Sequence, residues 1–427
     1  MSNKKIDTPS LGYNLLRKVM IVFLRIYYRR IAVRGQEHIP KGEAVIFAPN
    51  HKNALMDTLL ILYAYRCEPV VFMARGDIFR KGLIAACLRF LKILPVFRMQ
   101  NGVENLAKNA LPFEEAADTL KNRHKLCLMP EGRQVERRQL LPLVKGMFRI
   151  GMKAQERFGV GEGVKIIPTG IEYDDLLHSG RTVTIQFGSP VDLADYYDLY
   201  TENAPQAYNS IREVLYPKIS ELCLNVRSKD NYATVYLQAL LETDDFLQKN
   251  GLENTAWNRL HAKQALCRQW ENEEKNNTPT FVRAKQRAQA IYASGKTDDA
   301  IARLIKKPKA VDFLLMLTAL PLFIVGSLLM LPPCCLIKYA TKKLLNSGFY
   351  ATVSFVMGIV VPLVFFILYF LTGLLFLPAA GTSALFFLVL APILAVTAFK
   401  LKEIYFDTIG RCVFGRRFRQ WTDKSRR

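Results

Sequence analysis

The stretch FAPNHKNALMDTLL, residues 47–60, predicts both a fold and a chemistry for this chain. It begins as an apolar strand, turns at Pro49 and Asn50, and continues as an apolar helix. Both turn residues favour a break, because proline has no N–H for a strand ladder and asparagine bonds its own backbone. Six steps along a regular helix separate two side chains by roughly 240°. His51 and Asp57 can therefore meet only if His51 lies in the turn and Asp57 in the first turns of the helix.

Apolar strand-like runs alternate with helical runs from Ala32 to about Tyr197. The expected strands are 43–49, 68–74, 91–98, 125–130, 164–173 and 181–188, and the expected helices are 53–66, 81–92 and 109–122. Continuous apolar strands separated by helices indicate strands that are buried on both faces. The predicted fold class is α/β, with a layered sheet and flanking helices over residues 32–199. Residues 81–92 are expected either to line a channel or to form a plain core helix.

The C-terminal third is expected to enter a membrane. Residues 344–399, 56 in succession, carry no charge. A spanning helix needs about 20 apolar residues, so this run predicts a transmembrane hairpin that turns near 378–382. A second uncharged run, 313–337, contains three prolines, and we interpret 311–343 as a re-entrant or spanning segment, favouring one that enters and returns. Basic flanks favour an even number of crossings, with the catalytic domain on the cytoplasmic face of a multi-pass protein.

The remaining segments complete the predicted organisation. Residues 1–31 are expected to form an interfacial amphipathic helix, because apolar side chains from Leu11 to Ile26 share one side and basic residues lie largely elsewhere. Packing of this helix on the protein's own core is the alternative. Residues 200–310 lose the strand pattern and are predicted to be a helical insertion. Residues 400–427 form a basic tail.

The net charge of +22 restricts the class of partner. No nucleic acid partner is expected, because the chain has no zinc spacing, helix-turn-helix signature or aromatic platform motif. Basic residues flank the membrane-type segments, which favours anionic lipid and an anionic substrate, although solvated basic faces explain some of them. The eight cysteines have no metal or redox spacing and are expected to be reduced core residues. We expect no signal peptide, since the first ten residues are polar.

Polar residues also follow or close other expected strands. Arg98 ends the strand 91–98, Glu131, Gly132 and Arg133 follow the strand 125–130, and Pro168 lies in the strand 164–173. Ligands of open α/β sheets bind beyond the strand ends, so these residues suggest one common site. The planar fork of Arg98 suits a phosphate, and Gly132 permits close backbone approach. Taken singly, Arg98 is more typical of a surface cation and Glu131 of a loop carboxylate.

Four blocks in one order carry a family resemblance. They are NHKNALMD (50–57), LPVFR (94–98), LMPEGR (128–133) and IIPTGIEY (166–173). In sequence and spacing they resemble the four blocks of the glycerol-phosphate and lysophosphatidate acyltransferase family, over about residues 30–195. Five residues separate His51 from Asp57 instead of the usual four. This spacing is similar to that of the fungal type of glycerol-3-phosphate acyltransferase, which has a His-x-Asn core, and Asn53 matches the asparagine of that core. The third block departs from the family at Arg133, where Thr or Ser is usual, and this leaves the acceptor open.

The resemblance implies a fold of the glycerolipid acyltransferase kind and a set of roles. His51 would be the general base and Asp57 its orienting partner. Asn53, Arg98, Glu131 and Gly132 would bind the glycerol phosphate of the acceptor, and Pro168 would shape the floor of the site. Arg133 and Lys145 are our own additions, as cations near the third block that could contact the phosphate. We expect no metal and no cofactor, because a thioester already supplies a good leaving group; acyl-CoA or acyl carrier protein is the co-substrate.

The predicted function is therefore a membrane-bound O-acyltransferase of phospholipid biosynthesis. It would transfer a fatty acyl group from acyl-CoA or acyl carrier protein to glycerol 3-phosphate. Alternatives within this class are acylation of 1-acylglycerol 3-phosphate (lysophosphatidate) and of dihydroxyacetone phosphate. An alternative of another class is a catalytically degenerate, membrane-tethered binding module, which the altered third block favours and the His51 and Asp57 pair opposes.

Overall fold

The chain forms two compact units in the computed structural model. The described residues are 6–8, 10–79, 82–97, 109–158, 162–292, 301, 303–304, 308–342, 349–376, 382, 385–413 and 415. The first unit comprises residues 1–25, 31–173 and 183–225. The second comprises residues 26–30, 174–182 and 226–427. Each unit is described by itself below.

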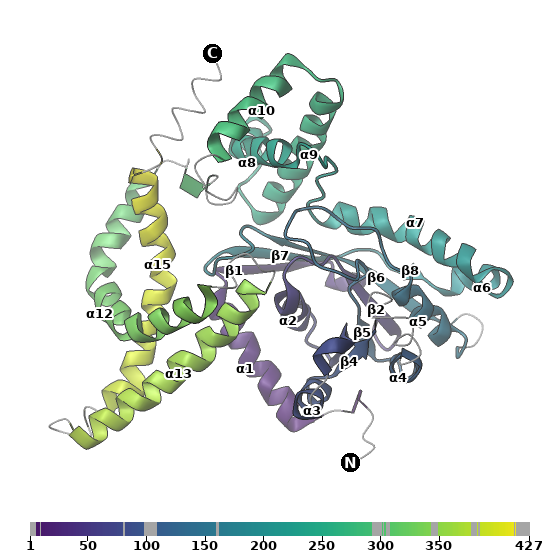
Figure 1. Cartoon of the computed structure of the whole chain (residues 1–427), viewed down its shortest axis with the longest axis horizontal. Helices are drawn as coiled ribbons and strands as arrows, with labels where there is room; N and C mark the ends of the chain where they lie inside the picture. The colour runs from purple at the N-terminus through teal and green to yellow at the C-terminus, as the bar shows by residue number, and fades with distance from the viewer. Residues whose placement is uncertain are drawn as a thin grey trace. The chain divides into compact units, whose positions relative to one another are not determined.

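An eight-stranded sheet forms the centre of the first unit (Figure 1). Its strands are β1 (Arg30–Arg34), β2 (Ala44–Pro49), β3 (Val70–Arg75), β4 (Ile93–Val96), β5 (Lys125–Cys127), β6 (Val164–Tyr173), β7 (Thr182–Phe187) and β8 (Val191–Asp192). The order is β1-β7-β6-β2-β5-β3-β4, and β8 pairs with β6. Strands β6, β2, β5, β3 and β4 are parallel, so their carboxyl ends lie at one edge of the sheet. Strands β7 and β8 run antiparallel to β6.

Helices cover both faces of this sheet. They are α1 (Leu11–Tyr27), η1 (Gln36–His38), α2 (Ala54–Ala64), η2 (Gly76–Phe79), α3 (Gly82–Phe90), α4 (Ala110–Lys121), α5 (Gly146–Gln155), η6 (Ala194–Tyr196), α6 (Tyr197–Glu202) and α7 (Ala204–Leu222). Residues of α4, α5 and α7 pack with alternate strand residues such as Ile46 into the main core. On the other side of β2, Phe47 packs against Tyr65, just after α2, with ring centroids 5.3 Å apart. Strand β2 is thus buried on both faces, as its continuous apolar run predicts.

The α/β class predicted from the sequence is confirmed. Each of the six expected strands and three expected helices corresponds to an element of the same type, β2 to β7 and α2 to α4. The unit also contains β1, β8, α5 and α7, which the sequence patterns did not place in the sheet domain.

Helix α7 extends the sheet unit to Asn225, whereas the sequence placed the boundary at residue 199. Its residues Ile211, Leu215 and Ile219 belong to the main core. The end of α7 approaches β6 closely at Gly170, where a Cβ atom would lie 2.1 Å from the carbonyl oxygen of Leu222. A side chain at this position would push the helix off the sheet.

The second unit is helical. Its helices are α8 (Tyr232–Lys249), α9 (Ala256–Lys275), α10 (Pro279–Tyr292), α12 (Ala310–Thr341), α13 (Tyr350–Phe376), the π-helical turn η8 (Phe386–Leu390) and α15 (Ala391–Val413). Helices α8 and α9 pack together, and Leu237 of α8 contacts the small and apolar face of α10 at Ala288 and Ile291. The side chain of Thr255 accepts a hydrogen bond from the N–H of Asn258 and so caps the start of α9.

Two helices in the described part of the chain are long and apolar enough to cross a membrane. They are Leu320–Thr341 within α12 and Tyr350–Leu375 within α13. Most of their large apolar side chains are exposed. Helix α12 runs through 32 residues without a break although it contains three prolines, and Figure 1 shows it curved, as internal prolines cause. A segment that enters a membrane and returns needs a turn, and the described residues of this helix contain none.

The first half of the hairpin predicted within 344–399 corresponds to α13. The expected turn near 378–382 falls almost entirely outside the described residues. The second limb corresponds to η8 and the first part of α15, which becomes charged from Lys400 onward. Helix α15 packs along α12, where a Cβ atom on Gly326 would lie 2.2 Å from the carbonyl oxygen of Leu394. The rings of Phe323 and Tyr405 stack at 3.9 Å nearby.

The expectation that all the cysteines are core residues is wrong for five of the eight. All eight are free thiols. Cys127, Cys223 and Cys267 are buried, and the exposed ones are Cys67, Cys87, Cys334, Cys335 and Cys412.

A cluster of charged side chains ties residues 174–182 to α15 within the second unit. We call it the ionic cluster; it comprises Asp175, His178, Arg181, Arg303, Glu403 and Asp407. Arg181 Nη1 lies 2.6 Å from Asp407, and Arg181 also pairs with Glu403. Burial alone would raise the pKa of Asp175, but hydrogen bonding from His178 and the charge of Arg303 hold that pKa well below its ordinary value. The ionised form of Asp175 therefore stabilises the folded chain.

We expect Asp175→Asn to lower the free energy of unfolding at pH 7 by about 3 kcal/mol, since it leaves the largely buried charge of Arg303 without this partner. A carboxyl whose pKa is depressed on folding stabilises the fold above its unfolded pKa, and this contribution is lost as pH falls through the folded value. The difference between wild type and variant should hold from about pH 8 to 5 and shrink below about pH 4. Thermal melts across this range measure it.

Asp174→Asn is the matched control. Asp174 is the residue before Asp175, is 47% exposed and lies 3.7 Å from Lys263. Removal of its charge should therefore change the free energy of unfolding by under about 0.5 kcal/mol. Equal losses of unfolding free energy in the two variants would contradict the stabilising role given to ionised Asp175.

Candidate active site

His51 and Asp57 meet at the carboxyl end of β2. The Nδ1 atom of His51 lies 2.9 Å from Oδ2 of Asp57. Because an ionised carboxylate only accepts hydrogen bonds, Nδ1 carries the proton and Nε2 is left with a lone pair. Asp57 is fully buried, whereas the His51 side chain is 17% exposed. The pair therefore leaves part of the imidazole accessible to solvent and buries the carboxylate that supports it.

The Asp57 carboxylate is held from several sides. The backbone N–H groups of Lys52 and Asn53 each donate to its Oδ2 atom at 2.8 Å. The hydroxyl of Tyr173 donates to its Oδ1 atom at 2.5 Å. Asp57 also lies in the first turns of α2, where free N–H groups and the helix dipole favour negative charge. These interactions allow a carboxylate to remain buried.

The turn between β2 and α2 has an unusual backbone. Ala54, the first residue of α2, has a φ of +37°, which non-glycine residues rarely adopt. Asn50 fixes the other end of the turn, since its side chain donates to Ile171 O at 3.0 Å and accepts from Ile171 N at 2.7 Å. This differs from the expectation that Asn50 bonds its own backbone. The asparagine instead continues the pairing of β2 with β6 beyond the last strand residue.

Glu131 lies beneath this turn and is buried. Its carboxylate accepts from the backbone N–H of His51 at 2.6 Å and of Leu141 at 2.8 Å. It also forms a buried ion pair with Lys52, with Nζ 3.3 Å from Oε2. Both oxygens are thus engaged inside the protein. Glu131 positions the His51 turn and the loop after β5.

Gly132 gives that loop its geometry. Its φ is +65°, in the left-handed region that glycine adopts at no steric cost. Its N–H closes a turn by donating to Met129 O at 3.1 Å. A Cβ atom there would also lie 3.0 Å from the side chain of Val144. The glycine therefore directs Glu131 inward.

Three supporting residues were missed by sequence reasoning: Lys52, Arg138 and Tyr173. Arg138 is buried and pairs with Glu172 at 2.9 Å, and it donates to Tyr173 O at 2.8 Å. A buried lysine or arginine in a basic chain gives no distinguishing sequence signal, since nearly all such residues are exposed. Tyr173 closes the fourth quoted block, and its place at the end of β6, next to β2, was the available signal.

The structure brings together five of the nine predicted site residues: His51, Asn53, Asp57, Glu131 and Gly132. Asn53 is buried at the start of α2. Pro168 lies in β6 beside Ala48 of β2. Arg133 and Lys145 are exposed on the segment between β5 and α5. Arg98 lies outside the described residues.

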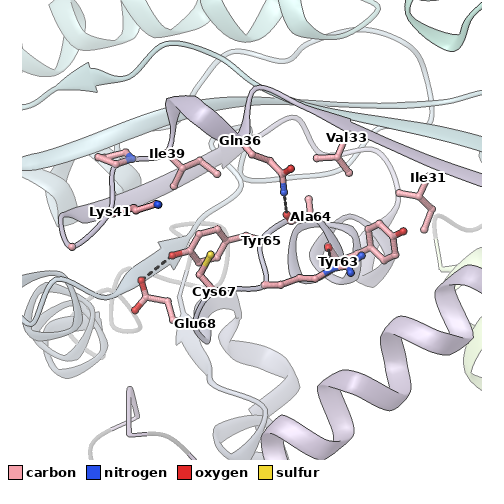
Figure 2. Close-up of a pocket in the computed structure, with 13 residues that line it drawn as sticks. Ile31, Val33, Gln36, Ile39, Lys41, Tyr63, Ala64, Tyr65, Cys67 and Glu68 are labelled. Carbon is pink, nitrogen blue, oxygen red and sulfur yellow. Dashed lines mark hydrogen bonds between the residues drawn. The ribbon is translucent and has the colours of Figure 1, made fainter.

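A cavity of about 600 Å³ lies elsewhere in the first unit (Figure 2). Its lining residues belong to β1 and to segments 36–42 and 63–68, which lead into β2 and β3. His51 follows the carboxyl end of β2, so this cavity opens near the opposite ends of the strands and contains none of the predicted site residues. The Tyr65 hydroxyl donates to Glu68 at 2.8 Å, and Figure 2 draws this hydrogen bond at the cavity wall. Burial and this bond raise the pKa of Tyr65.

Comparisons with known proteins find similarity to acyltransferases. Residues 30–172 match the profile of the Acyltransferase family. A probable 1-acyl-sn-glycerol-3-phosphate acyltransferase of Mycoplasma pneumoniae is 23% identical over 150 residues, which are 34% of this chain and 53% of that protein. The 1-acyl-sn-glycerol-3-phosphate acyltransferase of Borreliella burgdorferi is 22% identical over 200 residues, 45% of this chain and 74% of that protein. This chain therefore spans about half the length of the first relative and most of the second.

A solved structure was also found, that of the 1-acyl-sn-glycerophosphate (LPA) acyltransferase PlsC from Thermotoga maritima. It is 21% identical with a TM-score of 0.36, and the match covers 49% of this chain and 78% of that one. The family match begins at β1 and ends one residue before Tyr173, so it contains His51, Asp57 and Glu131. Residues 30–172 of this chain are therefore similar to the Acyltransferase family.

Proposed function

We propose that this chain is a membrane-bound glycerolipid acyltransferase whose acceptor is 1-acylglycerol 3-phosphate. The observation that carries the proposal is the His51 and Asp57 pair, with its buried carboxylate and partly accessible imidazole. The acceptor is taken from the names of the two relatives, which are both 1-acyl-sn-glycerol-3-phosphate acyltransferases. Glycerol 3-phosphate, the first acceptor expected from the sequence, becomes the second candidate. The five residues between His51 and Asp57 favour it.

The reaction needs a base at this place. An alcohol whose pKa lies far above 7 must lose its proton as it attacks the thioester carbonyl, and a positioned base typically contributes ~100- to 10,000-fold. Nε2 of His51 would take the proton while the new C–O bond forms. Asp57 would stabilise the resulting imidazolium. When the C–S bond breaks, the same proton would pass to the departing thiolate, so the enzyme ends the cycle unchanged.

The acceptor phosphate requires cations, and Arg133 and Lys145 are available on the segment that Glu131 anchors. A guanidinium fork matches phosphate geometry, which favours Arg133 as the first contact. Glu131 itself is engaged with Lys52 and two backbone N–H groups. We therefore assign Glu131 to positioning and not to acceptor binding. The anionic headgroup would then lie beside the basic nitrogen of His51.

The first unit also exposes an apolar surface that suits a bilayer. We call it the apolar surface; it comprises Leu11, Leu15, Val19 and Val22 of α1 with Leu83, Ile84 and Phe90 of α3. Leu11 is 90% and Leu83 80% exposed, and Phe90 lies against Gly12, which joins the two helices. Helix α3 has no buried residue, so the expectation of a plain core helix is wrong. This surface and the two long apolar helices support the proposal that the catalytic unit is held at the membrane. The basic residues that flank the apolar segments favour the cytoplasmic side.

Purified full-length protein in lipid nanodiscs should acylate 1-acylglycerol 3-phosphate when supplied with a labelled acyl thioester, either acyl-CoA or acyl-loaded acyl carrier protein. Parallel assays with glycerol 3-phosphate and dihydroxyacetone phosphate identify the acceptor. His51→Ala should reduce kcat by roughly 100- to 10,000-fold, because it removes the base. His261→Ala, on α9, is the control and should retain activity. Absence of transfer to all three acceptors, or full activity of His51→Ala, would refute the proposal.

A double-mutant cycle tests the role of Glu131. Glu131→Gln and Lys52→Met should each lower stability by roughly 3 kcal/mol, or about 6–12 °C in Tm, because each leaves part of a buried pair unpartnered. The double variant should lose less than the sum of the two losses. Arg133→Gln should instead raise the KM for the acceptor and leave Tm unchanged. If Glu131→Gln keeps the wild-type Tm and raises only this KM, Glu131 is an acceptor ligand.

The apolar surface can be tested by photolabelling. A phospholipid with a photoactivatable acyl chain should label peptides containing residues 11–22 and 83–90 in nanodiscs, besides those of α12 and α13. Peptides of α7, which packs on the sheet, should remain unlabelled. Replacing Leu11 and Leu15 with Asp should remove the label from α1, since charge is excluded from the acyl region. Equal labelling of the α1 and α7 peptides would argue against membrane contact.

A further inference from the structure

We propose that Tyr173 is a positioning residue of the reaction, which holds the Asp57 carboxylate in the orientation that His51 requires. The proposal rests on the function proposed above, and it extends the pair to a chain of three side chains, His51 to Asp57 to Tyr173. Its starting point is the 2.5 Å hydrogen bond from the Tyr173 hydroxyl to Oδ1 of Asp57. The side chains of both residues are buried.

The two oxygens of Asp57 have different tasks. Oδ2 accepts from Nδ1 of His51 and from the N–H groups of Lys52 and Asn53. Oδ1 accepts from Tyr173. The terminal torsion of an aspartate is broad and roughly two-fold, so a carboxylate held on one oxygen can still tilt out of the imidazole plane. A donor fixed on Oδ1 defines the carboxylate plane and keeps Oδ2 directed at Nδ1.

Tyr173 can serve as this fixed donor because its backbone is held. It is the last residue of β6, which pairs with β2 through six successive residues. Arg138 Nη2 donates to its carbonyl oxygen at 2.8 Å. The neighbouring Glu172 accepts from Arg138 and from the N–H of Leu224 at 3.2 Å. The phenol therefore projects from a rigid strand end.

The hydroxyl also affects the electrostatics of the pair. A hydrogen bond to Oδ1 draws negative charge away from Oδ2. The carboxylate therefore stabilises the protonated imidazole of His51 less strongly than it would without this bond. Loss of the hydroxyl should strengthen that stabilisation. His51 would then remain protonated, and hence inactive as a base, to a higher pH.

Other ionisable groups near the pair do not explain such an effect. Lys52 is paired with Glu131. On β5, burial raises the pKa of the Cys127 thiol, and the nearby charge of Asp57 raises it further. The pKa of Cys223 is raised, first by burial, in surroundings that include Lys52, Glu131 and Glu172. Both thiols are therefore neutral around pH 7.

Tyr173→Phe removes the hydroxyl and keeps the ring. We expect kcat to fall about 10- to 100-fold, as loss of a hydrogen bond to a charged group gives, while KM for the acceptor and for the thioester changes less than about two-fold. The acid limb of the kcat/KM profile should move to higher pH. Tyr200→Phe is the matched control, because it removes a hydroxyl bond of 2.8 Å to the carboxylate of Glu156. Its kinetics should equal those of wild type.

A readout without turnover separates this inference from the proposed function. The Nδ1 proton of His51 should give a far-downfield proton NMR resonance that His51→Gln and Asp57→Asn abolish. Tyr173→Phe should broaden or shift this resonance, and Tyr200→Phe should leave it in place. If wild type transfers no acyl group, the proposed function fails, and the resonance still decides the role of Tyr173. An unchanged resonance with unchanged kcat in Tyr173→Phe overturns the inference.

A second replacement covers the case in which Tyr173→Phe does not fold. Incorporation of 3-fluorotyrosine at position 173 keeps the shape and makes the hydroxyl a stronger donor. The acid limb of the kcat/KM profile should then move to lower pH, opposite to the expectation for Tyr173→Phe. A profile that does not move would overturn the inference.

Discussion

The site depends on burying the charge of Asp57. A carboxylate removed from water is costly unless hydrogen bonds replace its hydration. Here a histidine, two backbone N–H groups and a phenol supply them. Each donor imposes a condition on the fold: the turn after β2 must direct two N–H groups inward, α2 must begin directly after Asn53, and β6 must end at Tyr173. The geometry that favours proton abstraction is therefore also a geometry that the chain needs for stability.

A second buried charge supports the first. Glu131 accepts from the N–H of His51 on one side and from Lys52 and Leu141 on the other, so the loops after β2 and β5 are fixed to each other. The left-handed Gly132 allows the reversal that directs the carboxylate inward. This arrangement gives the glutamate and the glycine after β5 a role in positioning the two loops, as proposed above. Ligand contacts would fall to exposed cations further along the same segment.

Apolar runs made much of the sheet predictable from sequence, because β2 and the first residues of β3 are buried on both faces and need no alternation. Strand β7 was predictable from its alternation of Val, Ile and Phe with polar residues. The short edge strand β1 begins and ends with arginine, and β8 has two residues, so neither gives a pattern. Helix α5 contains two glycines, and α7 carries a proline inside. At the site, the spacing of His51 and Asp57 predicted their meeting. The partners Lys52, Arg138 and Tyr173 depend on tertiary burial, which residue type alone does not reveal.

The ionic cluster bears on how this chain can be divided. Residues 174–182 lie between β6 and β7 in sequence, yet Asp175 and Arg181 find their partners at Arg303, Glu403 and Asp407. A truncation after Asn225 would keep the sheet and all described candidate site residues while deleting those three partners. It would leave Asp175 and Arg181 without these ion-pair partners, on the connection that directly follows Tyr173. The sheet unit is therefore not a modular piece, and its excision would perturb the strand end that holds Tyr173 against Asp57.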